Sequence, residues 1–209
     1  MFGIHDFGVF VCAGILLNLT PGPDTVYILG RSIANGRAVG VASALGICIG
    51  SIFHTCAAGF GLSAILATSA WAFSAVKFVG AIYLIVLGLR TLFQREYDLK
   101  VSDRLKQADP VRALRQGVLT NILNPKVALF FLAFLPQFID STAPLKLFAF
   151  LILGLTFVTT GTIWCLILAW FASGFRARLQ QNATLAAFLT RVVGSLFVLL
   201  GLRLATAAR

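Results

Sequence analysis

Polar and helix-breaking residues interrupt an apolar segment near the start of the chain. Residues 18–24 read Asn-Leu-Thr-Pro-Gly-Pro-Asp, within an otherwise apolar run over residues 7–29. Two prolines each remove a backbone donor and clash with the preceding turn, so a continuous helix cannot pass through. The break puts a carboxylate in the first turn of a new half-helix, where N–H groups and the helix dipole favour an anion. The residues predicted to form a binding site here are Asn18, Pro21, Gly22, Pro23 and Asp24.

A second break has the same chemical ingredients. The sequence Asn124-Pro125-Lys126 lies near the centre of the apolar run 117–139, shortly after Asn121. Freed backbone groups in a membrane must be satisfied by protein or face a polar cavity. The asparagine amides can therefore bind a polar ligand or satisfy the carbonyls that the prolines leave unpaired.

Three ionisable side chains lie deep in apolar runs. Asp24 can load and release a proton, or it can cap its own half-helix. Lys126 can hold a substrate carboxylate, neutralise Asp24, or form a structural ion pair between the halves of the chain. His54 continues a stripe of small residues, Gly36, Gly40, Ser43, Gly46 and Gly50, that predicts a helix-packing surface. His54 is thus either hydrogen-bonded packing or a proton relay.

Composition identifies an integral membrane protein. Of 209 residues, 59% are hydrophobic and only 11% are charged, against about 25% in soluble domains. The formal net charge of +10 lies in the connections between apolar runs, which is the pattern of membrane orientation and not of a nucleic-acid surface. The cysteines Cys12, Cys48, Cys56 and Cys165 are dispersed and predict packing residues. No metal or cofactor motif is present, and we expect no enzyme.

Six apolar runs predict an all-α protein with six transmembrane helices. They cover residues 7–29, 39–67, 70–93, 117–139, 147–172 and 192–205. Lysine and arginine concentrate after the first, third and fifth runs, so both termini are expected outside the cytoplasm. No cleavable leader is expected, because residues 1–6 lack a basic region.

The two halves of the chain share a pattern. Residues 14–19 (Gly-Ile-Leu-Leu-Asn-Leu) correspond to residues 117–122 (Gly-Val-Leu-Thr-Asn-Ile), and each segment is soon followed by a proline. Two further matches follow in the same order. They predict a three-helix repeat over residues 1–93, a charged cytoplasmic loop over 94–116, and an inverted three-helix repeat over 117–209. The first and fourth helices are the broken ones, and such breaks meet at midplane sites in many secondary transporters.

The chain resembles the LysE/RhtB family of bacterial amino-acid exporters. The resemblance rests on Leu19-Thr20-Pro21-Gly22-Pro23-Asp24, on residues 80–84 (Gly-Ala-Ile-Tyr-Leu), and on residues 121–126 with the later Leu135-Pro136-Gln137-Phe138. It covers about residues 7–204. It implies proton-driven efflux of amino acids or their derivatives across the bacterial cytoplasmic (inner) membrane. By matching position it assigns the prolines, Gly22, Asp24, Asn124 and Lys126 to the site.

The charges favour one class of substrate. A cationic amino acid needs its own carboxylate partner in low dielectric, and Asp24 is the only acid deep in the apolar runs. We therefore expect neutral substrates of the threonine, homoserine or leucine kind, with protons and the lipid bilayer as the other partners. The alternative is a metal or inorganic-ion exporter, which would need clustered acids, histidines or cysteines. The sequence leaves a monomer and a homo-oligomer both open.

Overall fold

The computed structural model describes residues 2–62, 109–140 and 142–181, together with isolated residues of the later segments. These isolated residues are 78, 82, 85, 86, 89, 92, 191, 195, 198, 199 and 202. The runs expected at 70–93 and 192–205, and most of the charged loop at 94–116, lie outside the described residues. Within the described part all regular structure is helical, and a single antiparallel bridge joins Ile4 to Ile139. The all-α prediction is confirmed for these residues.

The first predicted break is present. Helix α1 covers Phe7–Leu19 and α2 covers Pro23–Asn35, and their axes are bent by 48°. The Thr20 N–H still bonds back to the carbonyls of Leu16 and Leu17, and the chain then turns extended. Proline fits the start of α2 because the first helical residues need no intrahelical N–H partner.

The second break is also present, and its first half begins earlier than expected. Helix α6 covers Pro110–Ile122, and Asp109 caps it by accepting the Arg112 N–H at 2.7 Å. After the break come α7 (Pro125–Leu129), a π-helical segment η3 (Phe130–Phe134) and a 3₁₀ segment η4 (Leu135–Phe138). The two halves are bent by 47°. Hydrophobicity alone missed the start at Pro110 because this first part of α6 is polar.

Two helices cross the bundle without such a break. Helix α3 covers Arg37–Ala57 and continues as the π-helical segment η1 (Ala58–Leu62). Helix α8 covers Lys146–Gln181, beyond the expected end at residue 172, and bends at Phe171. By length and composition, two of the described helices can span a membrane. If each bent helix pair is also taken as one membrane span, the described residues contain up to four spans.

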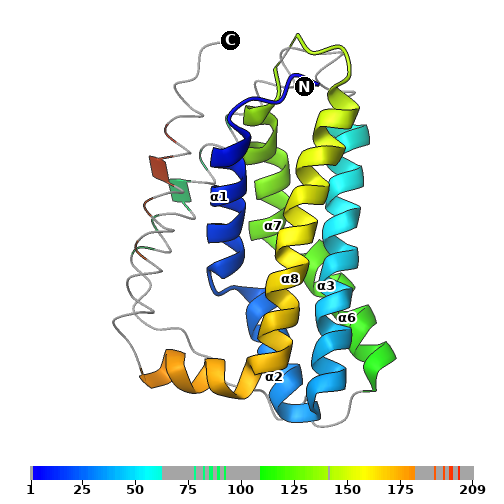
Figure 1. Ribbon diagram of the computed structural model, residues 1–209, viewed down its shortest axis with the longest axis vertical. Helices are drawn as coiled ribbons and strands as arrows, with labels where there is room; N and C mark the ends of the chain where they lie inside the picture. The colour runs from blue at the N-terminus through cyan, green and yellow to red at the C-terminus, as the bar shows by residue number, and fades with distance from the viewer. Residues whose placement is uncertain are drawn as a thin grey trace.

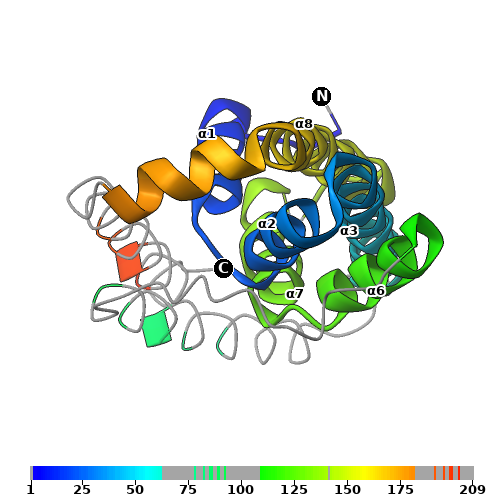
Figure 2. The same cartoon turned by 90° about the horizontal axis from the view of Figure 1, so that it is seen from below.

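The described helices of the two halves run in opposite directions. In Figure 1, α1 and α2 descend and α3 rises, whereas α6 and α7 rise and α8 descends. Figure 2 shows α2 surrounded by α3, α6, α7 and α8 in end view. The inverted repeat stays a prediction, because the third helix expected in each copy lies outside the described residues.

The small-residue stripe is a packing surface, as predicted. A methyl group added at Gly46 would overlap the Leu114 carbonyl of α6, and one added at Gly50 would lie 2.7 Å from Asn121 Cβ. In the reciprocal direction, a methyl group added at Gly117 would lie 2.6 Å from the Ser43 carbonyl oxygen. Close backbone contact between α3 and α6 therefore depends on these glycines. This contact brings the middle of α3 next to the second break.

Two apolar cores leave a polar level between them. One core unites α1, α7, η3, η4 and the first half of α8, and it is dominated by phenylalanines such as Phe10, Phe130 and Phe157. The other unites α2, α3 and the later part of α8 around Ile28, Ile47 and Leu168. Both breaks fall between these cores, which is where the candidate site lies.

Candidate functional site

A cavity of about 40 Å³ lies at the level of both breaks. Helices α1, α2, α3, α6, α7 and α8 all contribute to its wall. The lining residues are Leu17, Asn18, Gly22, Asp24, Thr25, Ile47, Cys48, Ser51, Asn121, Asn124, Lys126, Val127, Phe157, Val158, Gly161, Thr162, Trp164 and Cys165. A cavity of this size holds a few water-sized molecules.

Asn121 connects the two broken spans through Asp24. Its side-chain Nδ2 donates to Asp24 Oδ2 at 2.8 Å, and its Oδ1 accepts from the Ser51 hydroxyl at 3.2 Å. Asn121 is 1% exposed, so these bonds are shielded from competing solvent. The carboxylate of one break is thereby held by an amide next to the other break.

Lys126 satisfies the carbonyls that the first break releases. Its ammonium donates to the Leu17 carbonyl at 2.7 Å and to the Thr20 carbonyl at 2.8 Å. These carbonyls belong to the last turn of α1, which has lost its continuing helix and attracts a cation. Of the roles considered from the sequence, an ion pair with Asp24 is not formed between these two described residues. Lys126 instead joins the second break to the end of α1.

Two buried polar atoms on the cavity wall have no hydrogen-bond partner among the described residues. They are Asp24 Oδ1, an acceptor, and Asn18 Nδ2, a donor. Unpaired buried polar atoms cost about 1–3 kcal/mol each and are rare outside functional sites. The cavity thus presents one acceptor and one donor to whatever enters it.

Described side chains from different helices pack against one another at both ends of the cavity. On the side of α1 and η3, the rings of Phe10, Phe130 and Phe157 pack at centroid distances of 4.4–5.8 Å. On the side of α2 and α6, the Tyr27 hydroxyl donates to the Ala113 carbonyl at 2.7 Å. There Arg31, which is 4% exposed, donates to the Gln116 side chain.

Six of the residues predicted from sequence line this cavity, and four do not. Asn18, Gly22, Asp24, Asn121, Asn124 and Lys126 come together. Pro21, Pro23 and Pro125 shape the two breaks without lining it. His54 lies behind the wall, where its Nε2 meets the Asn121 carbonyl at 3.2 Å and its ring stacks on Phe131.

Sequence reasoning missed the wall formed by α8. Phe157, Gly161, Thr162 and Trp164 line the cavity, although their run looks like an ordinary apolar span. The only signal was one of the two further matches between the halves, in which residues 50–53 (Gly-Ser-Ile-Phe) correspond to residues 161–164 (Gly-Thr-Ile-Trp). A methyl group at Gly161 would come within 3.3 Å of Asn18 Oδ1, so this glycine leaves room for the Asn18 amide.

The cysteines are dispersed in sequence, but the fold brings two of them to the same cavity. Cys48 of α3 and Cys165 of α8 are distant in sequence, yet both line the cavity, where Cys48 contacts Thr162, one helical turn from Cys165. Sequence spacing could not reveal this, because it arises from the packing of α3 against α8. Among the described residues, no group of three or more histidines, cysteines or acids is placed to hold a metal ion.

A polar cavity at two proline breaks, inside a bundle of apolar helices, is the architecture of a membrane transporter. The sequence model of a family described as "LysE type translocator" matches residues 15–208. The chain belongs to this family, and it is a membrane transporter rather than an enzyme.

Named relatives cover nearly the whole chain. A leucine efflux protein of Klebsiella pneumoniae is 31% identical over 210 residues, covering 98% of this chain and 97% of the relative. Uncharacterized membrane proteins of Pseudomonas aeruginosa and Vibrio cholerae are 30% and 31% identical, again over 98% of this chain. No solved structure matches.

Proposed function

We propose that the protein exports neutral amino acids, or their derivatives with uncharged side chains, from the cytoplasm. The observation that carries the proposal is the unpaired acceptor Asp24 Oδ1 and unpaired donor Asn18 Nδ2 on the wall of one cavity. A zwitterion has both complements, an ammonium group and a carboxylate. The leucine efflux relatives support an amino acid as the substrate class.

The ammonium group of the substrate would bind Asp24. The substrate carboxylate would bind the Asn18 amide and the third N–H of the Lys126 ammonium, whose other two N–H groups bond to the Leu17 and Thr20 carbonyls. Lys126 lies beside the break, with its Nζ 3.6 Å from where a Gly22 Cβ would be. A second positive charge on the substrate would find no second acid, since no other Asp or Glu occurs deep in the apolar runs. Neutral side chains such as those of leucine, threonine or homoserine would instead rest on Phe157 and Val158.

Transport would proceed by alternating access, driven by the proton gradient. The cavity of about 40 Å³ is too small for an amino acid, so the helices would separate before substrate binds. Asp24 would carry the proton, because it is the only carboxylate in the site and an isolated intramembrane acid is expensive unless it functions. The two breaks, held together by Asn121 and Lys126, would be the moving parts.

Efflux from cells preloaded with single amino acids tests the substrate class. We expect leucine, threonine or homoserine to leave faster than lysine and arginine in cells that overproduce the protein. Lysine or arginine leaving faster than every neutral amino acid would refute the charge argument.

The proton role of Asp24 needs a matched pair of variants. Asp24→Asn keeps the size of the side chain but cannot carry a proton, so we expect a folded protein with little gradient-driven efflux. Asp140→Asn, at an exposed loop position, should export at the wild-type rate. The N-cap of α2 is Gly22, and no side chain caps this helix, so Asp24 does not take the capping role considered from the sequence. If Asp24→Asn exports like the wild type across the pH range, Asp24 serves only as the structural partner of Asn121.

A further inference from the structure

Two thiols and a hydroxyl meet on one side of the cavity. The Thr162 hydroxyl contacts Cys48 Sγ at 2.9 Å, and Cys165 lies one helical turn along α8 from Thr162, on the same wall of the cavity. Both cysteines are nearly inaccessible from outside, at 9% and 8% exposure, but both line the cavity. The other two cysteines, Cys12 and Cys56, are exposed on the outside of the bundle. The chain thus holds one internal thiol pair.

The donor set of this pair selects a particular kind of ligand. Thiolates are soft ligands that favour soft metals, whereas hard divalent ions need six or more oxygen ligands. No third histidine, cysteine or acid completes a group with these thiols among the described residues. A cation that accepts two thiolates in a linear arrangement, without further ligands, matches this pair best.

We propose that Cys48 and Cys165 form a binding site for a soft, thiophilic metal cation of the Hg²⁺, Ag⁺ or Cu⁺ class. Each thiol would release its proton to water and form one metal–sulfur bond, so no electrons are transferred and no oxidant is needed. With Hg²⁺ two protons leave as two positive charges arrive, and the bis-thiolate complex is neutral. A neutral complex avoids the cost of a net charge in the apolar interior. With Ag⁺ or Cu⁺ the complex carries one negative charge, and Lys126 on the same cavity wall can offset it.

Occupation of this site would stop transport. The metal would tie α3 to α8 across the cavity wall and would reduce the space in which the substrate must fit. The blocking effect rests on the proposed function, but the binding itself does not. Binding and transport are therefore measured separately.

The binding test titrates purified, detergent-solubilised protein with mercuric chloride. We expect the first equivalent to produce the ultraviolet charge-transfer absorption of a bis-thiolate complex and to protect two thiols from a thiol-reactive reagent. Cys48→Ser and Cys165→Ser should each lose the bis-thiolate absorption. The double variant Cys12→Ser/Cys56→Ser should keep it, because those thiols are exposed and are not part of the pair.

Two results would overturn the proposal. One is a bis-thiolate signal that survives in folded Cys48→Ser or Cys165→Ser protein, with folding checked by gel filtration. The other is loss of the signal in the Cys12→Ser/Cys56→Ser variant. In cells, Hg²⁺ should lower efflux by the Cys12→Ser/Cys56→Ser protein by a larger factor than efflux by the Cys48→Ser/Cys165→Ser protein, each compared with the same protein without Hg²⁺. If no amino acid is exported at all, the proposed function fails while the binding test still decides this proposal.

Discussion

At the scale of single residues, side chains of the second broken span form hydrogen bonds with polar groups of the first broken span. Asn121 holds the Asp24 carboxylate, and Lys126 holds the carbonyls at the end of α1. Each contact satisfies a polar group at a proline break. Backbone carbonyls and buried carboxylates that are shielded from water need hydrogen-bond partners within the protein. Binding capacity and structural support therefore share the same atoms.

Lys126→Met tests the structural part of this arrangement. Methionine keeps much of the apolar stem but leaves the Leu17 and Thr20 carbonyls unpaired, which should lower the free energy of unfolding by about 1–3 kcal/mol. We also expect efflux to fall, because the group proposed to bind the carboxylate is lost. Thermal unfolding in detergent measures the first effect, with Lys146→Met at the start of α8 as the control. Equal unfolding temperatures for wild type and Lys126→Met would show that the carbonyls have other partners.

His54→Gln separates packing from proton relay. Glutamine can still donate to the Asn121 carbonyl, which His54 contacts from outside the cavity. We expect efflux and its pH profile to stay close to wild type, with some loss of stability from the lost stacking on Phe131. A pH profile that flattens or shifts in a folded His54→Gln protein would instead support the relay role.

At the scale of elements, the contact between α3 and α6 sets the distance between the first and second halves. At Gly46 of α3 and Gly117 of α6 the two helices approach so closely that their backbones are in contact. This close approach puts Ser51 and His54 in reach of Asn121, and so fixes the residue that binds Asp24.

Gly46→Ala should therefore be destabilising. Its methyl group overlaps the Leu114 carbonyl, which is backbone and cannot move aside without shifting α6. Overpacking costs about 1–3 kcal/mol, and we expect the upper part of that range. Gly8→Ala is the control, because an added methyl group there meets nothing within 4 Å. Thermal unfolding of the two variants gives the comparison, and equal stability would mean that α6 shifts at no cost.

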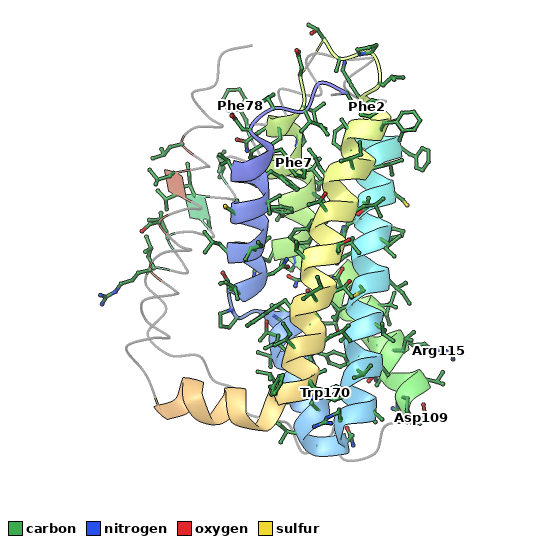
Figure 3. The ribbon with its side chains drawn as sticks, viewed as in Figure 1. Phe2, Phe7, Phe78, Asp109, Arg115 and Trp170 are labelled. Carbon is green, nitrogen blue, oxygen red and sulfur yellow. The ribbon has the colours of Figure 1, made fainter. Side chains whose placement is uncertain are left out.

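At the scale of the whole molecule, the charges are unequal at the two ends of the bundle. Figure 3 shows Asp109, Arg115 and Trp170 at the lower end, and Phe2 and Phe7 at the upper end. The lower end also holds Arg37, which stacks on the Trp170 ring at 4.1 Å. Positive residues favour the cytoplasmic side, so the lower end is expected to face the cytoplasm.

Cysteine labelling tests this orientation. In a variant without native cysteines, Thr142→Cys in the loop before α8 should react with an impermeant reagent added to intact cells. Ala108→Cys, in the charged loop before α6, should react only after the cells are opened. The opposite pattern would invert the topology and place the amino terminus in the cytoplasm.

The sequence alone determined the membrane class, the positions of both breaks and the candidate residues near them. These follow from local chemistry: apolar runs are read along the chain, and a proline breaks a helix wherever it lies. The family resemblance came from the same local motifs. The apolar run did not predict the start of α6 at Pro110, because the first turns of this helix are amphipathic.

Only the tertiary structure decided which side chains meet. Lys126 binds the end of α1 and does not pair with Asp24. His54 contacts the Asn121 carbonyl from outside the cavity, and Cys48 and Cys165 line the same cavity. These contacts depend on which faces of α3, α6 and α8 touch and at what distance. The physical reason is that interhelical contact depends on side-chain packing between distant segments, which no spacing within one segment encodes.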